Sequence, residues 1–161
     1  MATWYSNLYA SSSVRGITNN TESTTTSYSY KGPIAEKVGD HQTIRATYDC
    51  AGGAVNFSNS DVLHICKLPA GAKIIRITLS SGDDDVDSDN DFTFDLGTTT
   101  TANLYLNDST VLQAGAETAY VSEELEEIAA ASAGDSLLLT AAAGETNSSG
   151  TIYFLVEYVV I

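Results

Sequence analysis

Lysine and arginine are absent from the chain after Arg76. The 161 residues contain seven of these basic residues against 21 Asp and Glu, so the formal net charge is −14. Nucleic acids and anionic membranes are bound through clustered Lys and Arg. We therefore predict neither a nucleic-acid partner nor a membrane partner for this chain.

The basic residues that do occur are confined to the first half, where they are Arg15, Lys31, Lys37, Arg45, Lys67, Lys73 and Arg76. Few carboxylates oppose them there, so the first half is free to meet an acidic surface. The second half is purely acidic and is expected to repel its own copies. The simpler interpretation, that acidity only keeps the protein in solution, stays open.

Long apolar runs are also lacking. The longest one begins at Ile152, is interrupted by Glu157 and is far too short to span a bilayer. The first residues have neither a basic nor an apolar segment of the kind that signal peptides contain. We predict synthesis in the cytoplasm, without a membrane span.

Cysteine and histidine are scarce, with two residues of each. Cys50 and Cys66 are too few for a disulfide framework or a metal knuckle, so we interpret them as small apolar strand residues. His64 lies in an apolar segment and is interpreted as a hydrogen-bonded core or interface residue. Nucleophile elbows, phosphate-binding glycine loops and zinc motifs are missing. We predict a protein that is not an enzyme and has no catalytic residue, no cofactor and no metal.

Residues 1–40 differ in composition from the remainder. They are rich in Ser, Thr and Asn, lack apolar periodicity, and alone could not offset their chain entropy. They nevertheless carry aromatic residues, which binding segments use as anchors. We predict an extended N-terminal arm, with a reach of roughly 130 Å when fully extended. The alternatives are a disordered tail and a first strand that folds onto its own domain. The expected anchors on a partner are Trp4, Tyr5, Tyr9, Arg15, Tyr28 and Tyr30.

Residues 41–161 form a series of short segments with a period of two, which is typical of half-buried strands. One face of residues 43–50 is apolar through Ile44, Ala46, Tyr48 and Cys50. The same alternation predicts that Ile75, Ile77 and Leu79 share a face. Residues 61–68 are more uniformly apolar and predict a strand buried on both faces. Residues 68–71, Leu-Pro-Ala-Gly, predict a turn.

The last segment is apolar on both faces. Ile152, Phe154, Val156, Tyr158 and Val160 share one face, and Tyr153, Leu155 and Val159 lie on the other. Such a strand is either central in a sandwich or part of a subunit interface. The body, residues 41–161, is therefore predicted to be all-β, a β-sandwich of jelly-roll-like or immunoglobulin-like form. At most one short helix is expected, beginning at Ser122 and ending before Gly134, and an acidic loop is the alternative for this segment.

The segment Asp83–Asp91 has the highest density of carboxylates in the chain. Alternating carboxylates in a loop can converge on a calcium ion. Counted from Asp85, however, the pattern has Asn90 where an EF-hand needs glycine and Leu96 where it needs glutamate. A looser calcium site and a solvated hairpin loop that protects a sheet edge both remain open, and we favour the hairpin loop.

Several strand-and-turn patterns resemble those of small structural proteins of tailed bacteriophages, in particular capsid decoration (cement) proteins. The residues that carry the resemblance are Leu68–Ile75, Phe94–Thr98, Gly134–Thr140 and the segment from Gly150 into the terminal strand. The resemblance implies a sandwich fold and no catalytic residues. It also implies a homotrimer on the outer capsid surface of the virion, with an extended segment laid across the major capsid protein.

The leading hypothesis is thus a non-enzymatic decoration protein that binds and stabilises the lattice of the major capsid protein. Weak contacts repeated over a shell add up through avidity. The alternatives are a phage tail, head-fibre or adhesin module that binds a host surface glycan, and a calcium-dependent binding module.

Overall fold

The computed structural model of the chain describes residues 3–6, 9–11, 28–30, 41–50, 57–81, 86–87, 90–113, 117–121, 135–144 and 150–160. Its strands are β1 (Thr3–Tyr5), β2 (Tyr9–Ser11), β3 (Tyr28–Tyr30), β4 (His41–Asp49), β5 (Val62–Leu68), β6 (Ala72–Ser80), β7 (Thr93–Thr98), β8 (Leu106–Ser109), β9 (Glu117–Val121), β10 (Asp135–Ala143) and β11 (Thr151–Val160). A short 3-10 turn, η1 (Val111–Gln113), lies between β8 and β9.

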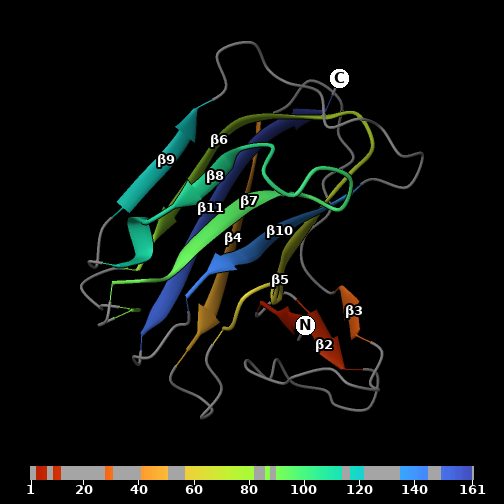
Figure 1. Ribbon diagram of the computed structural model, residues 1–161. Helices are drawn as coiled ribbons and strands as arrows, with labels where there is room; N and C mark the ends of the chain where they lie inside the picture. The colour runs from red at the N-terminus through yellow and green to blue at the C-terminus, as the bar shows by residue number, and fades with distance from the viewer. Residues whose placement is uncertain are drawn as a thin grey trace.

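The strands form a β-sandwich (Figure 1), which confirms the predicted fold class. One sheet is five-stranded with the order β1-β5-β10-β7-β8, and the other is four-stranded with the order β4-β11-β6-β9. The strands β2 and β3 make a separate two-stranded sheet.

The strand pairing of the body is that of a jelly roll. The first body strand pairs with the last (β4 with β11), the second with the next to last (β5 with β10), then β6 with β9 and β7 with β8, all antiparallel. This is the pattern of one long hairpin rolled up so that successive strand pairs alternate between the two sheets. Of the two sandwich types expected from the sequence, the structure is therefore the jelly roll.

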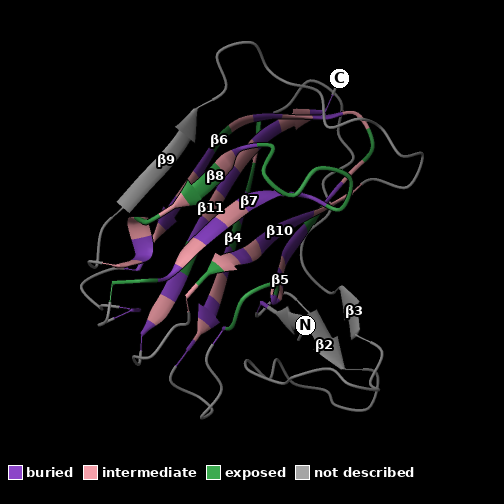
Figure 2. Ribbon diagram, viewed as in Figure 1, coloured by how far each residue is buried: buried purple, intermediate pink, exposed green. Residues whose placement is uncertain are grey.

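A single hydrophobic core fills the space between the sheets. The apolar face of β4 and the face of β11 that runs from Ile152 to Val160 point inward, as their alternation predicted. Inward and outward positions alternate along these strands (Figure 2). At one end of the core the rings of Tyr48, Phe57, Phe92 and Phe94 are stacked or tilted in a row, with centroids 5.1 to 6.2 Å apart. Complete burial of one such ring stabilises the fold by about 1.5–3 kcal/mol.

In β6 and in β5 a β-bulge interrupts the simple alternation that the sequence predicted. The pairing of β6 with β11 passes from Arg76 to Ile74, which leaves Ile75 without a partner, so Ile74 is buried and Ile75 is half-buried. The prediction that Ile75 shares the inward face with Ile77 and Leu79 was therefore wrong. An extra residue in one strand reverses the side-chain order on either side of it.

The second bulge lies in β5, where the pairing with β10 passes from His64 to Cys66. Ile65 and Cys66 are consecutive and both fully buried. The strand was expected to be buried on both faces, but its outer positions are half-buried at His64 and exposed at Lys67. The apolar run of β5 arises because the bulge lets two consecutive residues, Ile65 and Cys66, both point into the core. It does not indicate a second buried face.

The predicted turn after β5 is confirmed. The backbone N–H of Ala72 donates to the carbonyl of Pro69 at 3.2 Å, and Gly71 has a φ of 75°, a conformation that glycine adopts without steric cost. The expected helix from Ser122 to Gly134 lies outside the described residues. Among the residues that are described, no helix has the length and apolar character needed to cross a membrane.

Gly97 in β7 provides a test of the packing. A Cβ atom added there would lie 2.1 Å from the carbonyl oxygen of Thr101 and 2.4 Å from that of Ala102. Because the obstructing atoms are backbone, Gly97→Ala is expected to lower the free energy of unfolding by about 2 kcal/mol or more. Thr100→Ala, an exposed change in the same turn, should stay within about 0.5 kcal/mol of the parent. Urea denaturation measures both, and equal stability of the two variants would contradict this packing.

Candidate functional site

The predicted arm anchors that the structure describes lie in three short strands. Trp4 and Tyr5 lie in β1, Tyr9 lies in β2, and Tyr28 and Tyr30 lie in β3. The pairing of β2 with β3 brings Tyr9 opposite Tyr30. Arg15 lies outside the described residues. The division of the chain at residue 40 and the role of the anchors both stay predictions.

The start of the chain adds a strand to the body. β1 pairs in parallel with β5, with Trp4 opposite Leu63 and Tyr5 opposite His64. Ser6, which follows, is fully buried; its N–H donates to the carbonyl of His64 at 2.9 Å and its hydroxyl donates to the carbonyl of Ile65 at 2.5 Å. The edge of β5 is thus covered by the chain's own N-terminal strand, which limits its pairing with other chains.

His64 lies on the half-buried outer side of β5, at the strand edge that β1 covers. Burial lowers the pKa of His64, and the nearby charge of Lys67 lowers it further. The histidine is therefore kept neutral at neutral pH, in line with a packing role rather than an acid–base role.

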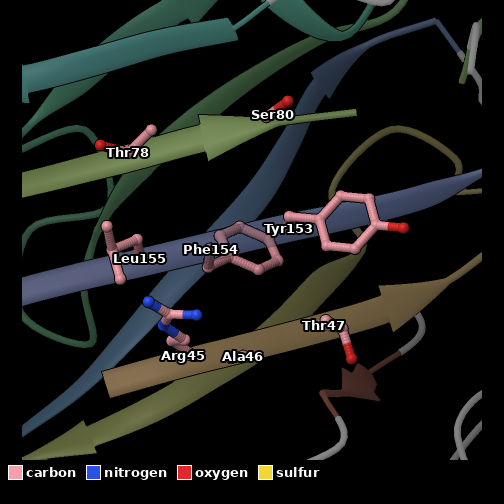
Figure 3. A pocket seen from close by; sticks show the side chains of 8 residues that line it. All are labelled: Arg45, Ala46, Thr47, Thr78, Ser80, Tyr153, Phe154 and Leu155. Carbon is pink, nitrogen blue, oxygen red and sulfur yellow. The ribbon is translucent and has the colours of Figure 1, made fainter. Parts of the chain in front are cut away.

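A groove of about 450 Å³ lies on the outer face of the four-stranded sheet, across β4, β11 and β6. Figure 3 shows Tyr153 and Leu155 on β11, flanked by Arg45 and Thr47 on β4 and by Thr78 and Ser80 on β6.

The register of the sheet explains why these side chains meet. Tyr153 is opposite Thr47 on one side and Ser80 on the other, while Leu155 is opposite Arg45 and Thr78. The intervening residue Phe154 is buried in the core. Tyr153 keeps 48% of its surface exposed, and Leu104 in a loop is the other large apolar residue exposed among the described residues.

The first predicted alternative for the last strand, a central position in the sandwich, is confirmed, and the subunit interface stays a prediction. β11 is central in its sheet, between β4 and β6, which accounts for its buried face. Its second face is only half-buried, and Tyr153 is the exposed position on it. Exposed aromatic groups in a concave surface are common in binding sites.

The acidic segment Asp83–Asp91 is described at Val86, Asp87, Asn90 and Asp91 only. Asp87 is fully buried, and its Oδ2 accepts a hydrogen bond from the backbone N–H of Phe92 at 2.7 Å. Its carbonyl accepts another from the N–H of Asn90 at 3.2 Å. This carboxylate therefore organises the backbone of the loop. The calcium alternative stays untested, since the other carboxylates up to Asp89 lie outside the described residues.

The remaining candidates for chemistry are metal ligands and the two cysteines. No cluster of His, Cys, Asp and Glu that could hold a metal ion occurs there. Cys50 and Cys66 are both free and buried, and burial raises the pKa of each thiol to about 12. Thiols of this kind are poor nucleophiles.

Comparison with known proteins gives matches at the level of structure. No family model and no curated protein matches the sequence. A chain of the cyanophage Pam1 capsid asymmetric unit superimposes with a TM-score of 0.63 at 21% identity, over 80% of this chain and 91% of that one. A chain of the capsid of Ralstonia phage GP4 gives a TM-score of 0.62 at 21% identity, over 81% of this chain and 90% of that one.

At this level of identity the likeness establishes a shared fold. The chain has the fold of chains found in two phage capsids. The resemblance to structural proteins of phage virions, which the sequence indicated, is therefore confirmed in the fold.

Sequence reasoning did not find the groove. The signal was present as the outward residues Arg45, Thr47, Thr78, Ser80, Tyr153 and Leu155, which alternate with the predicted core. What the sequence lacked was the order of the strands. The first and third body strands flank the last one, and this arrangement comes from long-range pairing.

The state of His64 can be tested through the pH dependence of stability. Folding lowers the pKa of His64 from its ordinary value of 6.5. Below about pH 6.5 the unfolded chain therefore binds a proton at this histidine that the folded chain excludes. The melting temperature should therefore fall between pH 7.5 and pH 5.5, and it should fall less in His64→Gln. Circular dichroism melts of both proteins measure this, and identical slopes would show that His64 takes up protons equally in both states.

Proposed function

We propose that the chain is a capsid decoration (cement) protein that binds the outside of a phage shell and stabilises the lattice of the major capsid protein. The observation that supports the proposal is the jelly-roll fold shared with chains of two phage capsids. Each superposition covers most of this chain and most of the matched chain. In this proposal the protein is a homotrimer on the outer surface of the virion and acts without catalysis or cofactor.

The size of the matched chains supports an accessory role. The alignments cover a smaller share of this chain than of the matched chains, so the matched chains are the shorter ones. A body of this size holds one sandwich core and little more. Such a subunit suits attachment to a shell that other chains build.

The charge of the protein supports the outer position. A net charge of −14 would repel packaged DNA on the inside of a shell, whereas on the outside it is tolerated. Repetition over the lattice then turns individually weak contacts into stable attachment.

A phage tail, head-fibre or adhesin module is the second candidate. The observation in its favour is the exposed ring of Tyr153 beside hydroxyl groups of Thr47, Thr78 and Ser80 in the groove, a combination that suits a sugar. A glycan-binding module would bind host-surface glycans with the groove and would not bind shells.

The test uses shells assembled without this protein. The full-length chain should co-sediment with them to saturation and raise their melting temperature in scanning calorimetry. Failure to bind the shells of its own phage would contradict the decoration role.

The arm is tested in the same assay with two variants. A chain beginning at residue 41 should keep its fold and lose binding. Since this truncation also removes β1 and Ser6 from the body, the double change Tyr28→Ala and Tyr30→Ala serves as the second variant, with β1 intact. We expect it to weaken binding by about 10-fold or more, because buried aromatic anchors carry much of the energy of an interface. Unchanged binding of both variants, with unchanged melting temperatures, would remove the arm from the interface.

A further inference from the structure

The strand β1 joins the N-terminal segment to the sandwich. It lies at the edge of the five-stranded sheet, where its one neighbour is β5. The strands β2 and β3 pair with each other in a separate sheet and with no described strand of the sandwich. Strand pairing therefore attaches the described part of this segment to the body at the edge of β5.

The bulge in β5 provides an acceptor for Ser6, the residue after β1. The pairing of β5 with β10 passes from His64 to Cys66, so Ile65 has no partner in β10. Consecutive carbonyls of a regular strand point to opposite sides. Here two consecutive ones are bonded to Ser6: its N–H donates to the carbonyl of His64 at 2.9 Å, and its hydroxyl donates to the carbonyl of Ile65 at 2.5 Å.

These hydrogen bonds make the edge of β5 selective. Ser6 is fully buried, so both bonds are shielded from water and an unmatched carbonyl there would be costly. The edge therefore fits a short parallel strand that is followed directly by a residue with a hydroxyl group. Residues 3–6 of this chain supply both features.

The segment between Ser6 and the body is held at both ends. Residues 7–40 connect Ser6 with His41, where β4 begins. If both ends belong to one body, this stretch closes a loop that reaches at most roughly 55 Å from it, half of its extended length. If β1 lies on a neighbouring body, the same stretch can span roughly 110 Å between the two. An arm that bridges a lattice therefore gains from placing β1 on a neighbour.

We propose that β1 is an exchangeable strand: in the assembled protein, residues 3–6 of one copy pair with β5 of a second copy, in the register described above. The inference rests on the proposed homotrimer and adds to it the contact that links the copies. In the isolated chain β1 covers its own β5 edge, and on assembly it moves to the equivalent edge of a neighbour. The strand loses no contact in this exchange, because the neighbour offers the same edge and the same bulge.

A second copy suits this edge better than a strand of another protein. A foreign strand would have to run parallel to β5 and place a hydroxyl group beside the Ile65 carbonyl, whereas every copy of this chain carries both features. Parallel pairing needs a long connection in any case, so it does not require that both strands belong to one body. Within an oligomer the neighbour's edge is also present at a high effective concentration.

Cysteine cross-linking distinguishes exchange from pairing within one chain. Thr3 and Val62 are opposite each other in the register of β1 and β5. Full-length Thr3→Cys and Val62→Cys chains are produced together in one cell, and the purified protein is oxidised both free and bound to shells. We expect a disulfide-linked dimer with one chain of each kind, because only exchange brings these two cysteines together.

Two controls accompany the cross-linking. The parent should form little dimer, because Cys50 and Cys66 are buried and burial raises the pKa of each thiol to about 12. Thr3→Cys produced with Lys67→Cys is the control for register. Lys67 is exposed further along β5, so it captures accidental collisions but lies out of register with Thr3. This pair should give at least about 5-fold less dimer than Thr3→Cys with Val62→Cys.

Ser6→Ala tests the exchange without an added cysteine. The change removes the hydrogen bond to the Ile65 carbonyl, so it should weaken self-association by about 5-fold, which corresponds to one hydrogen bond. Analytical ultracentrifugation measures this. Thr100→Ala, an exposed change on the same sandwich, should leave self-association unchanged.

The outcomes separate the inference from the proposed function. If the protein is an oligomer and the chain with both Thr3→Cys and Val62→Cys is oxidised only within single chains, the inference is overturned and the proposed function stands. The inference also fails if Ser6→Ala lowers the melting temperature but leaves self-association unchanged. A parent that is monomeric both free and on shells overturns the homotrimer and the exchange together. A parent that does not bind shells overturns the decoration role itself.

Discussion

The pairing of β4 with β11 is the constraint on which the rest of the structure depends. It runs without a bulge from Asp49 opposite Thr151 to His41 opposite Val159, and the N–H of Cys50 donates to the carbonyl of Gly150 at 2.7 Å beyond the strand ends. This pairing joins the first strand of the body to the last and closes the rolled hairpin. It also fixes both faces of β11: the inner residues complete the core, and the outer ones meet Arg45 and Thr47. A single register thus determines the core and the groove together.

Much of the body could be predicted because its strands obey a period of two. Ile44, Ala46 and Tyr48 are buried as their alternation indicated, and so are Ile152, Phe154 and Val156. The errors occur where a bulge interrupts that period, at Ile65 and Ile75. The hydrophobic pattern alone does not distinguish an extra backbone residue from a strand buried on both faces or from a continued alternation. The groove lay beyond prediction for another reason. It is assembled from β4, β6 and β11, which are far apart in the sequence, and their order depends on the global topology.

Strand pairing determines where the unevenly distributed charges of the sequence lie in the fold. The basic residues of the first half include Arg45, Lys73 and Arg76, which strand pairing gathers on one outer face. The carboxylates that follow along the chain include Asp95, Asp108 and Asp135, which belong to the other sheet. Because the jelly roll alternates successive strand pairs between its sheets, a separation along the sequence is only partly preserved in space. Asp49 and Glu157, on the same outer face as the three cations, are the result of that mixing.

The proposal that the chain is a small subunit attached to the outside of a phage shell can be tested with an electron cryo-microscopy map of the native particle. We expect density that fits this jelly roll, repeated over the outer surface at symmetry-related positions and present in hundreds of copies, as lattice decoration requires. Density confined to the tail, or a particle without such density, would contradict it.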